Sequence, residues 1–198
     1  MQHPDSNNFT LIIFASGNGS NAVKIIDYAQ TYNCFTVKAV FSNNKNAPVL
    51  QKASEKEIEV TAFTRDEFYH SDKIKEQLDQ IAPDLIVLAG FMWIFPKFIL
   101  DQFPKRVINI HPALLPKYGG KGMYGDHVHK AVLANQEKQS GITIHYVNEK
   151  YDEGQIIAQY ETQVDQRETL ESLKKKIQQL EHHYYPRVIH QLLKQKNG

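Results

Sequence analysis

Apolar runs alternate with amphipathic stretches along most of the chain. Five short runs rich in apolar residues predict strands. The first is apolar without interruption, a pattern typical of a strand that is covered on both faces. These predicted strands span residues 10–15, 37–41, 60–63, 85–89 and 106–110. The run at 85–89 is the most apolar, so we expect it at the centre of a sheet.

Between these runs, apolar side chains recur at helical spacing. Ile25, Ile26 and Ala29, for example, would share one face of a helix. The predicted helices span residues 21–31, 48–57, 71–81, 96–102, 126–135 and 168–196. We expect Asp126 to cap the fifth helix and Pro186 to kink the last. This alternation indicates an α/β fold, a mostly parallel twisted sheet with helices on both faces.

The alternation of predicted strands and helices stops after residue 140. Residues 141–147 and 155–160 have the pattern of two strands joined without a helix, which predicts a mixed edge to the sheet. No repeat, low-complexity tract or linker interrupts the chain. We therefore expect a single domain over residues 1–198, in which residues 1–8 form a polar N-terminal extension.

Composition changes this picture little. The chain has 198 residues, of which 41% are hydrophobic and 23% charged, and its formal net charge is +1. These ordinary values give no sign of a surface for nucleic acid or membranes. Residues 1–8 lack the apolar core of a secretion signal, and no apolar run reaches membrane-spanning length. We expect a cytoplasmic protein that binds neither nucleic acid nor membrane.

The sequence offers no metal-binding pattern. The single cysteine, Cys34, excludes an internal disulfide and a cysteine-based zinc cluster. His127 and His129 have no cysteine partner and no His-Glu-x-x-His pattern around them. We therefore expect no metal.

The strongest candidates for catalytic residues lie at the end of the predicted strand at 106–110. Asn109 and His111 are two residues apart, so their side chains would point to the same side. With a later carboxylate, Asp152, they could provide an oxyanion donor, a proton carrier and a group that orients the imidazole. The alternative is an ordinary turn or cap at a strand end. Pro112 forces the chain out of the sheet here, at the edge where α/β proteins bind ligands.

A glycine-rich loop, residues Gly17, Asn18, Gly19, Ser20 and Asn21, joins the first strand to the first helix. Glycines allow close backbone approach, and a helix N-terminus favours anions, so the loop fits a phosphate group. It lacks a Walker lysine and the third glycine of a dinucleotide fingerprint, which favours a small phosphomonoester over NAD. The alternative is a plain turn with a side-chain N-cap at Ser20 or Asn21.

Five motifs occur in a fixed order along the chain. They are Ser-Gly-Asn-Gly-Ser-Asn at 16–21, Val-Phe-Ser-Asn at 40–43, Ala-Pro-Asp-Leu-Ile-Val-Leu-Ala-Gly-Phe-Met at 82–92, Asn-Ile-His-Pro-Ala-Leu-Leu-Pro at 109–116, and Tyr-Asp-Glu-Gly at 151–154. Together they resemble the phosphoribosylglycinamide formyltransferases, folate-dependent enzymes of purine synthesis. The resemblance covers residues 11–190 and implies a Rossmann-like formyltransferase fold.

The resemblance implies a reaction and its catalytic residues. The amine of glycinamide ribonucleotide would attack the formyl carbon of the co-substrate 10-formyltetrahydrofolate, and N10 of the folate would leave. His111 would donate a proton and stabilise charge, Asn109 would bind the formyl oxygen, and Asp152 would pair with His111. The partners are these two small molecules, and a homodimer is left open.

The resemblance also implies two binding surfaces. The ribonucleotide would contact the loop Gly17 to Asn21 and the late positions Gln178, Gln179, Leu180 and Glu181. The folate would contact Arg65, Met92, Trp93, Ile94, Phe95, Asn109, Asn148, Glu149, Lys150, Tyr151 and Asp152.

The chain departs from the family pattern in three places. Trp93 stands where an arginine is frequent, the glycine-rich segment 117–125 is longer than the common form, and Asp126-His127-Val128-His129 replaces Leu-His-Thr-His. A 10-formyltetrahydrofolate hydrolase would share the catalytic set but usually carries a regulatory domain ahead of it. A methionyl-tRNA formyltransferase would carry a C-terminal RNA-binding extension. A nucleotide-binding module without catalysis is the alternative from another class.

Overall fold

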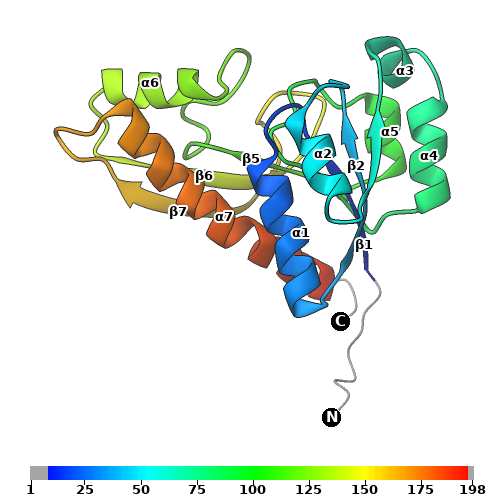
Figure 1. Ribbon diagram of the computed structural model, residues 1–198. Coiled ribbons are helices and arrows are strands. Elements are labelled where there is room, and N and C mark those ends of the chain that lie inside the picture. Colours follow the sequence, from blue (N-terminus) through cyan, green and yellow to red (C-terminus); the bar gives the residue numbers. More distant parts are fainter. Residues whose placement is uncertain (1–8, 196–198) are drawn as a thin grey trace.

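The computed structural model describes residues 9–195, so the predicted extension at 1–8 and the predicted last residue of the closing helix lie outside the described range. Seven strands form one sheet (Figure 1). They are β1 (Thr10–Phe14), β2 (Thr36–Ser42), β3 (Glu59–Ala62), β4 (Leu85–Leu88), β5 (Val107–His111), β6 (Gln139–Tyr146) and β7 (Ile156–Gln163).

The order of strands across the sheet is β3-β2-β1-β4-β5-β6-β7. The pairs among β1 to β5 are parallel, whereas β6 is antiparallel to both β5 and β7. The predicted parallel sheet and mixed edge are therefore confirmed. The expected central place of the most apolar strand is confirmed too, because β4 is the fourth of seven strands and all its residues are buried.

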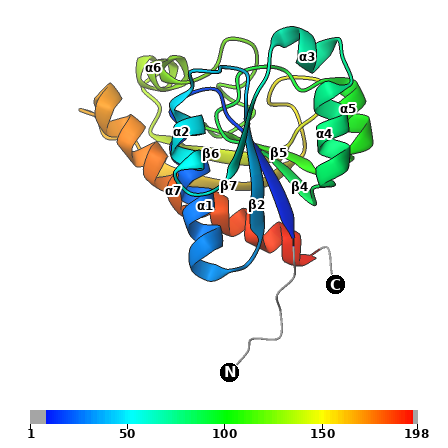
Figure 2. The same cartoon turned by 45° about the vertical axis from the view of Figure 1, so that its right-hand side comes forward.

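Helices cover both faces of the sheet (Figures 1 and 2). They are α1 (Ser20–Tyr32), α2 (Pro48–Ser54), α3 (Arg65–Tyr69), α4 (Lys73–Ile81), α5 (Lys97–Gln102), α6 (Asp126–Ala134) and α7 (Leu170–Gln195). The buried side chains of α1, α2, α6 and α7 belong to one core cluster, and those of α3, α4 and α5 belong to another.

Strand β1 shows why the two cores are separate. Leu11 and Ile13 pack into the first cluster, while Ile12 and Phe14 pack into the second. All four are fully buried, since successive strand residues point to opposite faces and both faces are covered. The unbroken apolar run in the sequence is a direct result.

Two local predictions were wrong, and so was the alternative of a side-chain N-cap at Ser20 or Asn21. Gly19 and Gly125 occupy the N-cap positions of α1 and α6 and make no side-chain cap, so neither Ser20, Asn21 nor Asp126 is an N-cap. Asp126 instead forms a salt bridge with Lys174 at 2.9 Å. Helix α2 ends at Ser54, three residues before the predicted end.

The sequence prediction also missed α3. This five-residue helix begins with a capping box, in which the Thr64 hydroxyl accepts from the Glu67 backbone N–H and the Glu67 carboxylate accepts from the Thr64 backbone N–H. The Thr-x-x-Glu signal is present in the sequence, but the helix is too short to show a periodic apolar face. Helix α7 continues through Pro186. Among residues 9–195, no helix is long and apolar enough to cross a membrane.

Candidate active site

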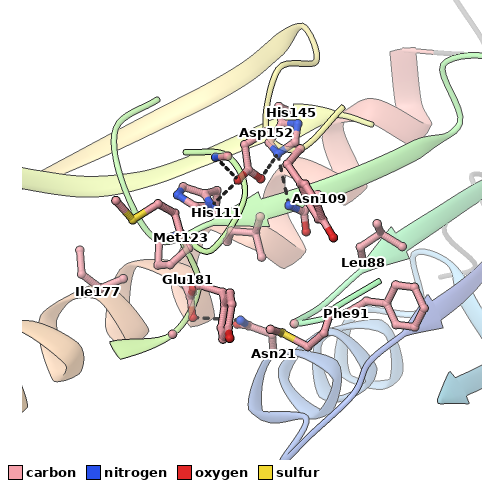
Figure 3. A pocket seen from close by; sticks show the side chains of 18 of the residues that line it. Asn21, Leu88, Phe91, Asn109, His111, Met123, His145, Asp152, Ile177 and Glu181 are labelled. Carbon is pink, nitrogen blue, oxygen red and sulfur yellow. Dashed lines mark hydrogen bonds and ion pairs between the residues drawn. The ribbon is translucent and has the colours of Figure 1, made fainter. Parts of the chain in front are cut away.

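A cavity of about 800 Å³ opens at the carboxyl ends of β4 and β5. Strand β5 ends at His111, and the next residue, Pro112, begins the turn out of the sheet. Both Asn109 and His111 line the cavity, as their spacing on the strand predicts. Asp152 joins them from the loop between β6 and β7, so that all three side chains meet in one corner (Figure 3).

His111 and Asp152 form the buried centre of this corner. The His111 Nδ1 atom lies 3.4 Å from the Asp152 Oδ2 atom, and the two side chains are only 4% and 10% exposed. Burial raises the pKa of the Asp152 carboxyl, but its contacts with the His111 and His145 rings lower it by more. The net effect holds the pKa of Asp152 well below its usual range, so the carboxylate is ionised and able to fix the imidazole.

The second ring nitrogen of His111 is also engaged. Its Nε2 atom lies 2.8 Å from the backbone carbonyl oxygen of Tyr118. Because Nδ1 faces a carboxylate and Nε2 faces a carbonyl, the imidazole has a hydrogen-bond acceptor on each side. This arrangement suits a ring that carries a proton on both nitrogens.

His145 completes the corner, and the sequence analysis missed it. Its Nδ1 atom lies 2.9 Å from the Tyr146 carbonyl oxygen, so this nitrogen carries the proton and donates. Its Nε2 atom lies 3.2 Å from Asn109 Nδ2 and 3.6 Å from Asp152 Oδ1. The only sequence signal was a histidine inside an apolar strand. The register that sets His145 opposite Asn109 is a property of the β5–β6 pairing.

Gly154 allows the loop after Asp152 to pass close to this corner. A Cβ atom at residue 154 would lie 1.6 Å from the Tyr146 carbonyl oxygen, which is the oxygen that accepts from His145. Any side chain there would displace the backbone that orients His145. The glycine in the Tyr-Asp-Glu-Gly motif is therefore required by a close backbone approach.

The segment between β5 and α6 lies over the corner. The Gly120 N–H donates to Asp152 Oδ2 at 3.0 Å, and Tyr118 supplies the carbonyl opposite His111. Lys121, Met123 and Tyr124 line the cavity from the same segment. This glycine-rich segment thus forms part of the cavity wall.

The predicted ribonucleotide residues are brought together only in part. Asn21 Nδ2 donates to Glu181 Oε2 at 2.9 Å, and both side chains line the cavity (Figure 3). Gln178 also lines the cavity, and its amide lies 3.5 Å from the Ser20 hydroxyl. Burial raises the pKa of Glu181, while the hydrogen bond from Asn21 opposes that rise.

The other predicted ribonucleotide residues lie beside the cavity. Gly17, Asn18, Gly19 and Ser20 precede Asn21 at its rim and do not line it. Gln179 is exposed, and Leu180 packs against the hydrophobic core.

Most of the predicted folate residues form one wall of the cavity. Met92, Trp93, Ile94, Phe95, Asn148, Lys150 and Tyr151 line it together with Asn109 and Asp152. Two predicted residues do not line it. Glu149 forms a salt bridge with Lys97 at 3.3 Å. The Arg65 guanidinium carbon lies 5.1 Å from the centre of the Tyr69 ring and 5.6 Å from that of Trp93. Arg65 therefore stacks behind the wall that Trp93 forms.

His129 lines the cavity from α6 and is buried. Its Nδ1 atom has no hydrogen-bond partner within the described part of the chain. Burial lowers the pKa of this imidazole, with Asp126 opposing that shift. Residues 9–195 contain no group of three or more His, Cys, Asp or Glu side chains placed to hold a metal ion.

The fold and the corner define a formyl transferase: the sequence profile of the family described as Formyl transferase matches residues 9–189. Phosphoribosylglycinamide formyltransferase of Escherichia coli K12 is 37% identical over 185 residues, 90% of this chain and 84% of that protein. The chain belongs to the phosphoribosylglycinamide formyltransferase family.

Three further comparisons show how far the match extends. The chloroplastic phosphoribosylglycinamide formyltransferase of Arabidopsis thaliana is 38% identical over 185 residues, but the match spans only 63% of its length. The crystal structure of phosphoribosylglycinamide formyltransferase from Bacillus halodurans superposes with a TM-score of 0.83 at 35% identity, over 93% of this chain and 95% of that one. A formyltetrahydrofolate deformylase from Pseudomonas syringae has a TM-score of 0.84 at 21% identity, a likeness of fold alone.

Proposed function

We infer that this protein transfers the formyl group of 10-formyltetrahydrofolate to the amine of glycinamide ribonucleotide, a step of purine synthesis. The observation that carries this conclusion is the meeting of Asn109, His111 and Asp152 in one buried corner of a cavity. The cavity has an apolar wall for a folate ring system and a polar end at Asn21 and Glu181. These three groups can hold an oxyanion and move a proton, which acyl transfer to an amine requires.

The reaction balances without another reactant. The amine nitrogen attacks the formyl carbon, and the carbonyl oxygen takes up negative charge in a tetrahedral intermediate. The bond from that carbon to N10 then breaks as the carbonyl re-forms. One proton leaves the attacking amine and one arrives at N10, so the protein must hold an oxyanion and move a proton.

Asn109 is proposed as the oxyanion donor, held in place by His145. Since His145 donates from Nδ1, its Nε2 can accept one N–H of the Asn109 amide. A side-chain amide has two such hydrogens, and the other remains for the formyl oxygen. His145 is therefore proposed as a positioning residue that acts through Asn109.

His111 is proposed as the group that moves the proton. Asp152 holds the ring at Nδ1, which leaves Nε2 as the nitrogen that can exchange its partner. That partner is now the Tyr118 carbonyl. We propose that the reacting atoms take the place of this carbonyl when both substrates are bound. The ionised Asp152 then stabilises the ring whenever it carries the extra proton.

The binding surfaces follow from the two ends of the cavity. We propose that the ribonucleotide contacts Asn21, Gln178 and Glu181, with its phosphate at the loop of residues 17–21. The folate ring system would lie along Met92 to Phe95 and the loop of residues 148–152. A cytoplasmic location and a homodimer are further parts of the proposal, which cell fractionation and light scattering would test.

A substrate assay tests this function directly. The protein is mixed with 10-formyltetrahydrofolate, with and without glycinamide ribonucleotide, and the loss of formylfolate is followed. Turnover that requires the ribonucleotide is the expected result. Equal turnover with water alone would identify a hydrolase, and no turnover in either mixture would support a binding module.

A further inference from the structure

The loop of residues 17–21, proposed above as the phosphate site, contains no cationic side chain of its own. The structure supplies one from elsewhere in the chain. Lys52 of α2 places its Nζ atom 3.0 Å from the backbone carbonyl oxygen of Asn18 and also donates to the Asn18 side-chain oxygen. A positive charge therefore lies against the loop, although it is 34 residues away in sequence.

Helix α2 holds the same loop at two more points. The Val49 N–H donates to the Gly17 carbonyl oxygen at 3.2 Å. The Val49 side chain packs on Gly19, where a Cβ atom would lie only 2.1 Å from Val49 Cγ2. Gly19 has a φ of 72°, in the left-handed region that glycine adopts without strain. One turn of α2 thus fixes Gly17, Asn18 and Gly19 in succession.

These contacts determine where the loop directs its N–H groups. In a planar trans peptide the carbonyl and the following N–H point in opposite directions. The Asn18 carbonyl points at Lys52, so the Gly19 N–H points away from α2. The Gly17 carbonyl points at Val49, so the Asn18 N–H also points away. Two neighbouring donors are therefore presented on the face of the loop opposite α2.

Lys52 also makes the Gly19 N–H a stronger donor. A cation bound to a carbonyl oxygen polarises the whole peptide group, which strengthens the bond that its N–H can make to an anion. The ammonium group adds a long-range attraction for phosphate. Lys52 lies on the far side of the loop from these N–H groups, so the first effect acts through the Asn18–Gly19 peptide and the second acts through space.

We propose that Lys52 is a positioning residue of the phosphate subsite: it orients the Asn18–Gly19 peptide and provides the positive charge that the loop lacks. This proposal rests on the proposed function, because that function places the ribonucleotide phosphate at residues 17–21. Lys52 contacts no reacting atom, so it affects binding of the ribonucleotide and leaves the chemical step unchanged.

The test compares Lys52→Met, Lys52→Gln and Lys52→Arg with a control, Lys56→Met. Lys56 follows the end of α2 and pairs with Asp27 at 2.6 Å, away from the loop. Lys52→Met is expected to raise KM for glycinamide ribonucleotide about tenfold, the size of one charge-assisted hydrogen bond. The turnover number and KM for formylfolate should stay within about twofold. Lys52→Arg should recover most of the loss, and Lys56→Met should match the wild type.

Inorganic phosphate gives a readout that does not depend on catalysis. Its dissociation constant, measured by NMR titration, should rise with Lys52→Met by the same factor as KM. Lys52→Gln keeps a donor but loses the charge, and serves if the methionine variant fails to fold. An equal rise in both KM values, a fall in turnover number, or no change relative to Lys56→Met would overturn the proposal. A wild-type protein that binds phosphate but transfers no formyl group would instead contradict the proposed function.

Discussion

The two sides of the cavity are built in opposite ways. The side chains of the proposed catalytic corner are buried, with His111 4% and His145 3% exposed. Each also has several contacts, and Asp152 touches both histidines. The wall proposed to bind the folate is apolar and open, with Met92 41% and Ile94 37% exposed. The difference teaches that chemistry depends on groups held fixed before substrate arrives, whereas affinity for an apolar ligand depends on surface left uncovered until it binds.

The largest expected effect concerns the pair His111 and Asp152. His111→Ala and Asp152→Asn should each lower the turnover number by about a thousandfold or more, because the two act as one proton-transfer unit. The double variant should be little worse than the more damaging single variant. Steady-state kinetics measures all three, with circular dichroism as the check on folding. A double variant that loses the product of the two single losses would show that they act independently.

Asn109→Ala should have the next largest effect. Removing one oxyanion donor typically costs about a hundred- to a thousandfold in turnover. The dissociation constants of both substrates should stay within about threefold, because the formyl oxygen gains its charge only in the intermediate. Asn109→Asp should be at least as damaging, since a carboxylate would repel the oxyanion. Single-turnover rates and calorimetry on the same preparations separate the two quantities.

His145 provides a control on that interpretation. If it acts through Asn109, then His145→Ala added to Asn109→Ala should cost nothing further in turnover. Strong loss of substrate affinity in Asn109→Ala, with the chemical step spared, would make Asn109 a binding residue instead.

The folate wall should respond differently. Met92→Ala should raise KM for formylfolate about five- to tenfold and change the turnover number less than twofold, because it removes apolar area that only the ligand covers. Phe98→Ala is a matched control: Phe98 is 37% exposed but does not line the cavity. A fall in turnover number with Met92→Ala would show that wall and corner are not separate in function.

The smallest effect is a pH dependence of stability at His129. Burial lowers the pKa of this group in the folded protein, so the native state binds fewer protons than the unfolded chain in mild acid. Its contribution to stability is therefore present above about pH 6.5, the unfolded value, and is lost as pH falls from there through the lowered pKa.

Urea unfolding of the wild type and His129→Gln between pH 5 and pH 7 would measure this contribution. The variant should lose less stability on acidification than the wild type. His183→Gln is the control, because His183 is exposed. Equal slopes for the wild type and His129→Gln would show that His129 has no part in the dependence.

The sequence predicted the sheet well because its signals are local. Apolar residues dominate most of the parallel strands, and the two late strands lack a helix between them, so the architecture and the mixed edge could both be predicted. Helix ends were read less well. Gly19 and Gly125 begin helices without a side-chain cap, and α3 is too short to show periodicity.

The site was predictable where strand geometry or a motif fixed it. Spacing alone put Asn109 and His111 on one side of β5. The contribution of His145 depends on strand register, and that of Lys52 on the packing of α2 against a distant loop. Neither the strand register nor this packing contact can be read from the sequence alone. Gln179 and Leu180 were included because residues 178–181 resemble the late substrate contacts of the family. Successive helical residues point in different directions, however, and of these four only Gln178 and Glu181 reach the cavity.

A crystal structure with glycinamide ribonucleotide and a 10-formyltetrahydrofolate analogue bound tests the central claim most directly. The account predicts the formyl oxygen within about 3 Å of Asn109 Nδ2, a hydrogen-bond distance. It also predicts that His111 Nε2 faces the reacting atoms in place of the Tyr118 carbonyl. A formyl group bound away from Asn109 and His111, with the Tyr118 contact intact, would contradict it.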